Sequence, residues 1–415
     1  MPEPIAISDR PKFRKVPVSR LRPGMFVCDL QTGWLHHSFW RKEFLIEDER
    51  TVARLHEDAI REVVIDTVRG IDIEPEPGAD ERERFAELDE RYQQAARSRR
   101  EQARLAVSLD EERQRLQFFR RDAMAAMHRL DQAVRAGQPV DIAGTEPMIE
   151  RMLRSVRQHP DALIPLLQIK DHYQHQHSLS VAAMVLALGS TLGLDDDVLR
   201  QAAQGALLKD VGVLRIPEDI LQKPDSLTDY ERRVVRRHVF DSQMILEDSP
   251  GMTETMLDVV VHHHERLDGS GYPHALTGDQ VPMHAQLAAI VDVYDALTSD
   301  RPYHGRVEPY DALRHLYALS GSHFRADLLR AFVRTLGVYP VGTLVRLDNG
   351  YLAVVTEVHR DKLLQPRVLV MFDTRSDRYL TPFPLDLAHR AGPPAIVGVE
   401  SYAARGIDPR RWQTA

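Results

Sequence analysis

With 415 residues, the chain is too long for one ordinary domain, and two or three domains are expected. A hydrophobic content of 43% and a mean hydropathy of -0.36 exclude an integral membrane protein, because even the longest apolar stretch, Val181 to Leu194, is too short to span a bilayer. The net charge of -8 argues against a nucleic-acid polymer as partner, and the single cysteine, Cys28, excludes an internal disulfide. Because the N-terminus also lacks a secretory signal, we expect a cytoplasmic protein without membrane insertion.

Residues 12–74 are predicted to form a small mixed α/β domain with a regulatory or structural role. Short strands are expected at residues 15–18, 25–30 and 63–66, and a helix at residues 51–60. No catalytic constellation stands out in this segment. The adjacent His36 and His37 are interpreted as surface or packing residues.

Residues 80–122 are rich in Glu, Arg, Gln and Ala, and apolar residues recur at helical spacing, beginning with Phe85, Leu88 and Tyr92. We predict a long, charged helical linker. It could pair with a second copy as a coiled coil, which would give a homodimer, or lie alone as a solvated helix on its own chain.

From residue 123 to 338 the pattern is helix after helix, with apolar stripes separated by Pro and Gly. Helices are expected at residues 148–156, 178–188, 197–208, 229–246, 253–264, 284–297 and 309–319. Residues 339–400 instead hold short alternating or buried runs between turns, which predict a small β appendage of about four strands. The expected fold class is mainly α: an all-helical domain with a small α/β N-terminal domain, a helical linker and a small β C-terminal appendage.

The most distinctive stretch runs from His262 to Pro273 and combines three histidines and two acids with a Gly-Ser-Gly-Tyr-Pro turn. Histidine is the commonest nitrogen ligand for metals, and glycine permits close approach of backbone to a ligand. Taken alone, the stretch fits either a metal site beside a ligand-binding loop or a run of surface histidines before an ordinary turn.

Six metal-competent side chains lie on or beside otherwise apolar helices: His177, Asp210, His238, His263, His264 and Asp292. A buried, unpaired carboxylate is strongly disfavoured, so Asp292 within Ala-Ile-Val-Asp-Val-Tyr needs a cation. Neighbouring helical residues point about 100° apart, so His263 and His264 can address two ions or two sides of one site. Each residue alone could be an ordinary core or surface residue, but the six together favour a metal site.

The run HHERLDGSGYP (residues 263–273), followed by DVYDALTSDRPY (292–303), resembles the HD-GYP family of bacterial cyclic di-GMP phosphodiesterases. HSLSVA (177–182), IPEDILQKPDSLT (216–228) and His238 support the resemblance, which covers roughly residues 145–340. The N-terminal segment with RPGMFV is similar to the small uncharacterised domain that precedes this module in some members.

The resemblance implies metal-dependent hydrolysis of cyclic di-GMP to pGpG or GMP in second-messenger signalling, with iron or manganese as the metal and signalling proteins as further partners. It implies that the six residues above are metal ligands. It also implies ligand contacts at Gly271, Tyr272, Pro273, Asp295 and Arg301. Tyr173 stands where some members carry a glutamate that supports a third ion, so one or two ions per chain are expected.

At the catalytic pair the sequence departs from the family pattern. The signature His-Asp pair is Lys209-Asp210 here, and Val213 replaces the lysine of the His-Asp-x-Gly-Lys pattern. Because a free lysine has a pKa of ~10.4, it is a cation and not a metal ligand near neutral pH. Lys209 would therefore repel metal ions, or take the space and charge of one ion and leave a mononuclear site.

Three hypotheses follow. The first is a metal-dependent cyclic di-GMP phosphodiesterase, impaired by Lys209 and Val213. The second is a catalytically inactive module that binds cyclic di-GMP or a partner protein as an effector. The third is hydrolysis of another nucleotide, which the Gly-Tyr-Pro elements disfavour.

Overall fold

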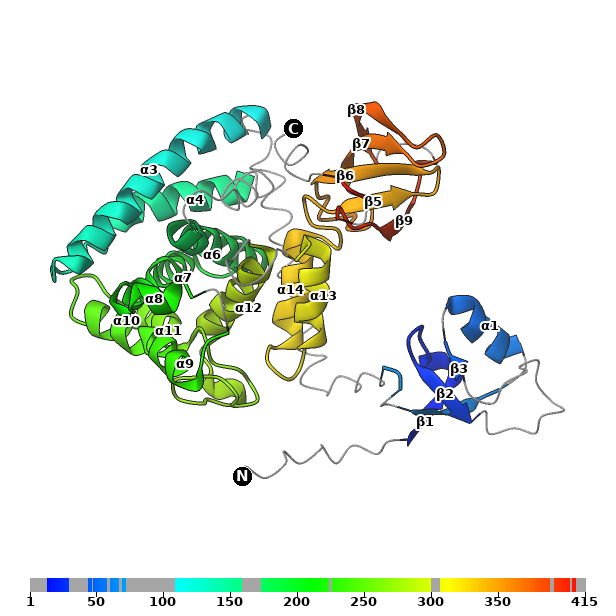
Figure 1. Cartoon of the computed structure of the whole chain (residues 1–415), viewed down its shortest axis with the longest axis horizontal. Coiled ribbons are helices and arrows are strands. Elements are labelled where there is room, and N and C mark those ends of the chain that lie inside the picture. The colour runs from blue at the N-terminus through cyan, green and yellow to red at the C-terminus, as the bar shows by residue number, and fades with distance from the viewer. Residues whose placement is uncertain are drawn as a thin grey trace. The chain divides into compact units, whose positions relative to one another are not determined.

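The computed structural model describes residues 13–29, 44–46, 48–57, 60–66, 69–71, 109–158, 173–223, 226–299, 307–388, 392–403 and 405–407. The chain divides into two compact units, residues 1–83 and 84–415 (Figure 1). His36, His37 and most of the expected linker, up to residue 108, lie outside the described residues. No helix in the described ranges is long and apolar enough to cross a membrane.

The N-terminal unit is a small α/β fold, as the sequence predicts. Its described elements are β1 (Phe13–Pro17), η1 (Val18–Arg20), β2 (Phe26–Asp29), β3 (Phe44–Leu45), α1 (Glu49–Glu57) and β4 (Glu62–Asp66). The strands form one antiparallel sheet in the order β1-β4-β2-β3. Val16, Val27 and Val63 on the sheet and Leu55 on α1 are fully buried in one core, so the alternating apolar residues of the strands face the helix.

The helical part of the second unit begins with α3 (Leu109–Arg135), η2 (Ala143–Thr145) and α4 (Glu146–Gln158). Helix α3 continues without a break across residue 122, where the sequence placed the end of the linker. Leu116, Phe119 and Ala123 of α3 are buried in the same core as α4 and the following helices. The last turns of the expected linker thus pack on the helical domain.

The centre of this domain is α6 (Tyr173–Thr191), which is buried on all sides from Gln176 to Gly189. A helix that is apolar all round is a core helix. Helices α7 (Asp196–Leu208) and α12 (Met283–Thr298) pack on it, and α11 (Glu254–His262) packs on α7 and α12. Gly205 lets α11 approach α7, because a Cβ there would lie only 2.7 Å from the carbonyl oxygen of Met256. These helices carry the candidate metal ligands.

Smaller helices complete the domain: η3 (Val211–Arg215), α8 (Glu218–Leu221), α9 (Asp229–Arg236), α10 (His238–Leu246), η4 (Gly278–Gln280), α13 (Pro309–Ala318) and α14 (Ala326–Leu336). The prediction of one helix over residues 229–246 is wrong, because the helix is broken at Arg237. No Pro or Gly marks the break. It coincides with tight packing of η3 on α10, where a Cβ at Gly212 would lie 2.2 Å from the carbonyl oxygen of His238.

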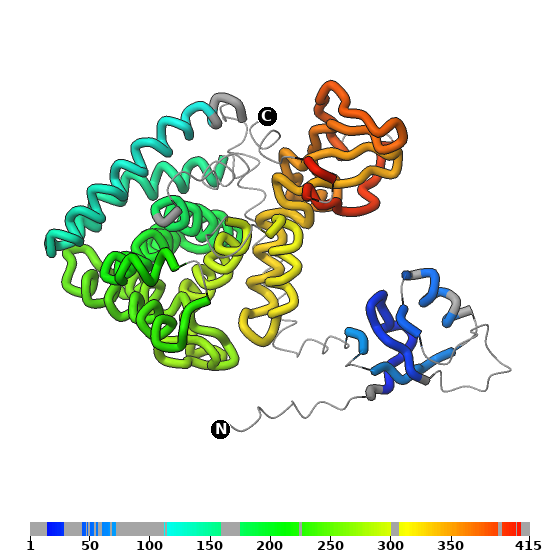
Figure 2. Tube along the Cα trace, in the orientation of Figure 1, coloured from blue at the N-terminus to red at the C-terminus, as the bar shows by residue number. Residues whose placement is uncertain are grey.

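The chain then enters an antiparallel sheet, whose trace Figure 2 shows in orange to red. Its strands are β5 (Leu344–Leu347), β6 (Tyr351–Glu357), β7 (Arg367–Asp373), β8 (Arg378–Asp386) and β9 (Ile396–Val399), in the order β8-β7-β6-β5-β9. The sheet has five strands where about four were expected. Strand β8 carries little sequence signal, because it is an exposed edge strand that contains Pro382 and Pro384, which are tolerated only at such edges.

Candidate metal centre

The Lys209-Asp210 turn follows directly on α7 and is held against α10. The hydroxyl of Ser242 accepts a 2.8 Å hydrogen bond from the Gly212 N–H and donates a 2.7 Å bond to the Lys209 carbonyl. Because Gly212 has no Cβ, α10 can lie close enough to bring His238 beside Asp210.

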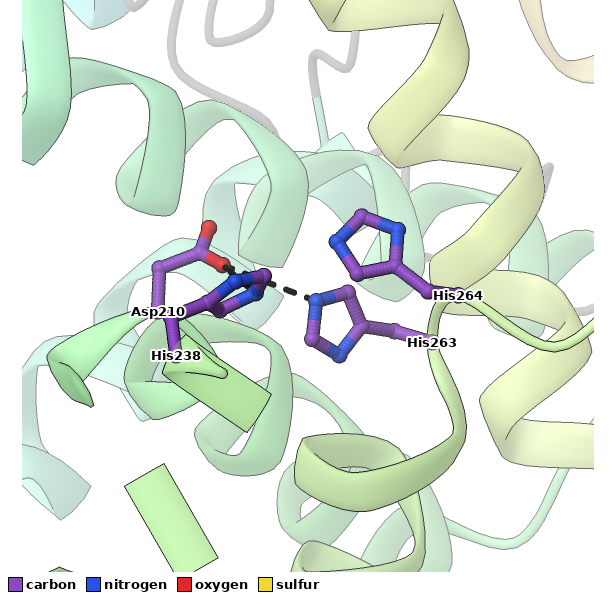
Figure 3. A group of neighbouring side chains, drawn as sticks. All are labelled: Asp210, His238, His263 and His264. Atoms are coloured by element: carbon purple, nitrogen blue, oxygen red, sulfur yellow. Dashed lines mark ion pairs between the residues drawn. The ribbon is translucent and has the colours of Figure 1, made fainter. Parts of the chain in front are cut away.

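Four side chains converge at this point. Single ligand atoms of Asp210, His238, His263 and His264 all lie within 4.8 Å of one another (Figure 3). Nε2 of His238 is 3.4 Å and Nε2 of His263 is 3.5 Å from Oδ1 of Asp210. We call these four residues cluster A. The rings of His238 and His263 are buried, whereas Asp210 and His264 are partly open to solvent.

Hydrogen bonds to the backbone set the tautomers of two of these histidines. Nδ1 of His238 lies 2.7 Å from the Val235 carbonyl, and Nδ1 of His263 lies 2.9 Å from the Val260 carbonyl. Since a carbonyl only accepts, each Nδ1 carries the proton and each Nε2 of a neutral ring is a bare lone pair. Both Nε2 atoms are buried without a hydrogen-bond partner.

Burial favours the neutral form of His263 and His264. Desolvation lowers the pKa of His263, although the nearby carboxylate of Asp210 acts in the opposite direction. Desolvation and the neighbouring His263 hold the pKa of His264 well below its usual range. Neutral imidazole lone pairs that face a carboxylate at close range call for a cation between them, and three imidazoles with one carboxylate suit a divalent transition metal. Cluster A therefore fits one metal ion.

A second group, cluster B, consists of His177, Asp210 and Asp292, whose ligand atoms also lie within 4.8 Å of one another. Its centre is taken by the ammonium of Lys209. Nζ of Lys209 forms an ion pair with Oδ2 of Asp210, lies 2.7 Å from Oδ1 of Asp292, and lies 3.3 Å from Nε2 of His177. Only 1% of the Lys209 side chain is exposed.

The charge on Lys209 is stable at this position. Burial alone would lower the pKa of its ammonium, but the carboxylates of Asp210 and Asp292 outweigh burial and raise that pKa above the ordinary lysine value. In return, Lys209 helps to hold the pKa of both carboxylates well below their usual range, against the effect of desolvation. Lys209 thus supplies one positive charge at the centre of cluster B.

His177 is held from both sides by carboxylates. Nε2 lies 2.9 Å from Oδ1 of Asp292, and Nδ1 lies 2.7 Å from Oδ2 of Asp295. Burial and the charge of Lys209 would lower the pKa of His177, but the two carboxylates raise it above its usual value. Asp295 is fully buried behind the ring.

The Gly-Tyr-Pro turn lies directly against cluster A. The Tyr272 ring stacks on His264 with centroids 4.6 Å apart, and the guanidinium of Arg236 lies 4.9 Å from the centre of the Tyr272 ring. Gly271 makes this approach possible, because a Cβ there would lie 2.4 Å from the backbone nitrogen of Arg266. Buried Glu265 accepts hydrogen bonds from the backbone N–H groups of His274, at 2.7 Å, and Leu276, at 3.1 Å.

Two protein-family models match the chain: one described as "HD domain" at residues 161–328, and one described as "Domain of unknown function (DUF3391)" at residues 13–145. A cyclic di-GMP phosphodiesterase of Pseudomonas aeruginosa is 38% identical over 395 residues, which cover 94% of this chain and 93% of the relative. The chain belongs to the HD-GYP family.

Other relatives match a smaller share of the chain. The cyclic di-GMP phosphodiesterase response regulator of Xanthomonas campestris pv. campestris is 38% identical over 34% of this chain and 38% of its own length. A 3'3'-cGAMP-specific phosphodiesterase of Vibrio cholerae serotype O1 is 36% identical over 36% of this chain and 35% of its own length.

The structure brings together all six side chains that the HD-GYP resemblance implies as ligands, in two groups that share Asp210. Of the implied substrate contacts, Gly271, Tyr272 and Pro273 lie in the loop beside cluster A, whereas Arg301 lies outside the described residues. The buried position of Asp295 favours a role in orienting His177 over the implied contact with substrate.

Sequence reasoning missed Gly212, Arg236 and Glu265. Glu265 stands within the HD-GYP run, and a carboxylate directly after the paired histidines His263 and His264 was open to a supporting role. Arg236 carried no signal, because it is one of several arginines on an exposed helix.

Proposed function

We propose that this HD-GYP protein hydrolyses the phosphodiester bonds of cyclic di-GMP in a metal-dependent reaction. The observation that carries the proposal is cluster A, with the buried Nε2 atoms of His238 and His263 facing Asp210 beside the Tyr272 loop. The relative that matches almost end to end is named a cyclic di-GMP phosphodiesterase.

We propose Asp210, His238, His263 and His264 as the residues that hold the ion, with iron or manganese as the metal. When bound, a divalent ion lowers the pKa of a water molecule and neutralises charge on phosphoryl oxygens. In the hydrolysis, the water oxygen bonds to phosphorus as the bond from phosphorus to the ribose 3′ oxygen breaks, and a proton passes to that oxygen. The product is linear pGpG, and a second hydrolysis gives GMP.

The protein's own residues position the substrate beside the ion. Tyr272 presents an aromatic surface next to His264, and exposed Arg236 supplies positive charge at its face. Guanidinium groups recognise phosphate oxygens well. We therefore propose that the loop of Gly271, Tyr272 and Pro273, with Arg301, contacts the dinucleotide.

We propose the domain division that the sequence predicts, with residues 12–74 as a regulatory domain, 80–122 as a linker, 123–338 as the catalytic domain and 339–400 as the β appendage. The packing of Leu116 and Phe119 on the catalytic domain supports a linker that ends on the domain it controls. Homodimerisation through the linker and binding of signalling proteins remain predictions.

The test uses the purified full-length protein with Mn²⁺ or Fe²⁺ under anaerobic conditions. Cyclic di-GMP is expected to disappear as pGpG or GMP appears in liquid chromatography, and His238→Gln is expected to abolish the turnover. 3'3'-cGAMP is assayed in parallel, because one relative is named for it. Binding of cyclic di-GMP without product under both metals would contradict the proposal and favour the inactive effector.

A further inference from the structure

Clusters A and B differ in whether a protein side chain already places a positive charge between the potential metal ligands. In cluster A the described residues place no cation between the carboxylate and the histidine lone pairs, and the Nε2 atoms of His238 and His263 have no hydrogen-bond partner. In cluster B a cation is built in, because the Lys209 ammonium contacts one atom from each of the three potential ligands.

An ion in cluster B would have to share space with that ammonium. Metal–ligand bonds to oxygen and nitrogen are about 2.0–2.2 Å long, so an ion bound by Asp210, Asp292 and His177 must lie between their ligand atoms. Nζ of Lys209 lies in that same space, 2.7 Å from Oδ1 of Asp292 and 3.3 Å from Nε2 of His177. The side chain is buried, and the hydrogen bond from Ser242 to the Lys209 carbonyl holds its backbone.

Nε2 of His177 already has close neighbours in cluster B. It lies 2.9 Å from Oδ1 of Asp292 and 3.3 Å from the Lys209 ammonium. In cluster A, Nε2 of His238 and of His263 faces Oδ1 of Asp210 at the longer distances of 3.4 Å and 3.5 Å. The donor set of cluster B is therefore organised around Lys209 and not around a metal.

We propose that the chain binds one metal ion, in cluster A, and that Lys209 permanently replaces a second ion in cluster B. The inference rests on the metal dependence in the proposed function, and it specifies how many metal ions the centre binds and which residues bind them. A fixed ammonium keeps Asp210 oriented toward cluster A and supplies positive charge that cannot dissociate. Metal activation should then follow a one-site binding curve.

The experiment measures metal stoichiometry without substrate, so that its outcome is independent of catalytic activity. Metal-free full-length protein is titrated with Mn²⁺, and bound metal is counted by elemental analysis and by electron paramagnetic resonance, which distinguishes an isolated Mn²⁺ from a coupled pair. One isolated ion per chain is expected. Two ions per chain, or the signal of a coupled pair, would overturn the inference even if the protein cleaves cyclic di-GMP.

Matched variants assign the ion to a cluster. His238→Gln, in cluster A, should reduce Mn²⁺ binding at least 100-fold, whereas His177→Gln, in cluster B, should retain one ion with affinity within about tenfold of the original. Equal loss in both variants would contradict the assignment.

A third variant, Lys209→His, should raise the count from one ion to two and produce the coupled signal. Circular dichroism verifies that it is folded. A folded Lys209→His protein that still binds one ion would overturn the role given to Lys209. If this variant is unfolded, the number of ions bound by the original protein and by the two glutamine variants tests the inference.

Discussion

Nζ of Lys209 lies 2.7 Å from Oδ1 of Asp292, and both side chains are buried in the core of the helical domain. The same ammonium also pairs with Asp210. A single lysine therefore pairs with two carboxylates, of which Asp292 is buried and Asp210 is partly open to solvent. Removal of one partner from a buried ion pair is strongly destabilising, because the remaining charge is uncompensated.

Lys209→Met should therefore destabilise the metal-free protein by about 3–5 kcal/mol, measured by chemical denaturation. Lys223→Met is the matched control: Lys223 pairs with Glu231 near the surface, and its loss should cost no more than about 1 kcal/mol. Mn²⁺ should restore more stability to Lys209→Met than to the unmodified protein, since the vacated carboxylates can then take a metal. If both substitutions lower the free energy of unfolding equally, the buried Lys209 ion pairs contribute no more to stability than the surface pair of Lys223.

Gly271→Ala should weaken cyclic di-GMP binding at least tenfold while leaving bound metal unchanged. The added Cβ would meet backbone atoms of His264, Glu265 and Arg266 at 2.4 to 2.6 Å, so the loop must move away from His264. Isothermal titration calorimetry measures the affinity, and elemental analysis measures the metal. Gly398→Ala is the control, because its Cβ would meet only the end of Arg346 at 3.6 Å and should change neither quantity.

Glu265→Ala should loosen the Tyr272 loop. The substitution removes the acceptor from the backbone N–H groups of His274 and Leu276, at a cost of about 1–3 kcal/mol for a group left unsatisfied. Hydrogen exchange at these two amides should accelerate, and the KM for cyclic di-GMP should rise more than kcat falls. Glu265→Gln keeps one acceptor oxygen, so its amide exchange rates and its KM should lie between those of the original protein and those of Glu265→Ala. Unchanged exchange in Glu265→Ala would rule out this supporting role.

Asp295→Asn separates two roles for this carboxylate. The asparagine oxygen can still accept the His177 Nδ1–H, so the affinity of Asp295→Asn for cyclic di-GMP should stay within about threefold of the original. Asp295→Ala removes this acceptor and should lower the free energy of unfolding by about 1–3 kcal/mol. Affinity and unfolding are measured on the same preparations. A tenfold weaker affinity in Asp295→Asn would favour the direct substrate contact that the family resemblance implies.

Most of the helical fold follows from the sequence because apolar stripes and Pro or Gly stops are local signals. The α6 and α12 segments were predicted within a few residues of their observed ends. The break at Arg237 and strand β8 were not predictable in this way, because the first depends on contact with Gly212 and the second buries little apolar surface.

At the candidate site, too, some features follow from local sequence signals and others depend on contacts between distant residues. Residue types and their apolar surroundings indicated which six side chains could bind metal, but spacing along the chain did not divide them into two groups. The alternatives for Lys209 were repulsion of metal or replacement of one ion. Only its position between Asp292 and His177 supports replacement, since this contact joins three separate helices.

The interruption at Arg237 places two neighbouring side chains, Arg236 and His238, on different helices. Arg236, at the end of α9, faces the Tyr272 ring, whereas His238, at the start of α10, belongs to cluster A. Helix α9 has no buried residue, but α10 is anchored through Ser242 to the Lys209-Asp210 turn. Arg236 thus lies on an exposed helix, while His238 is fixed to the turn that carries Asp210.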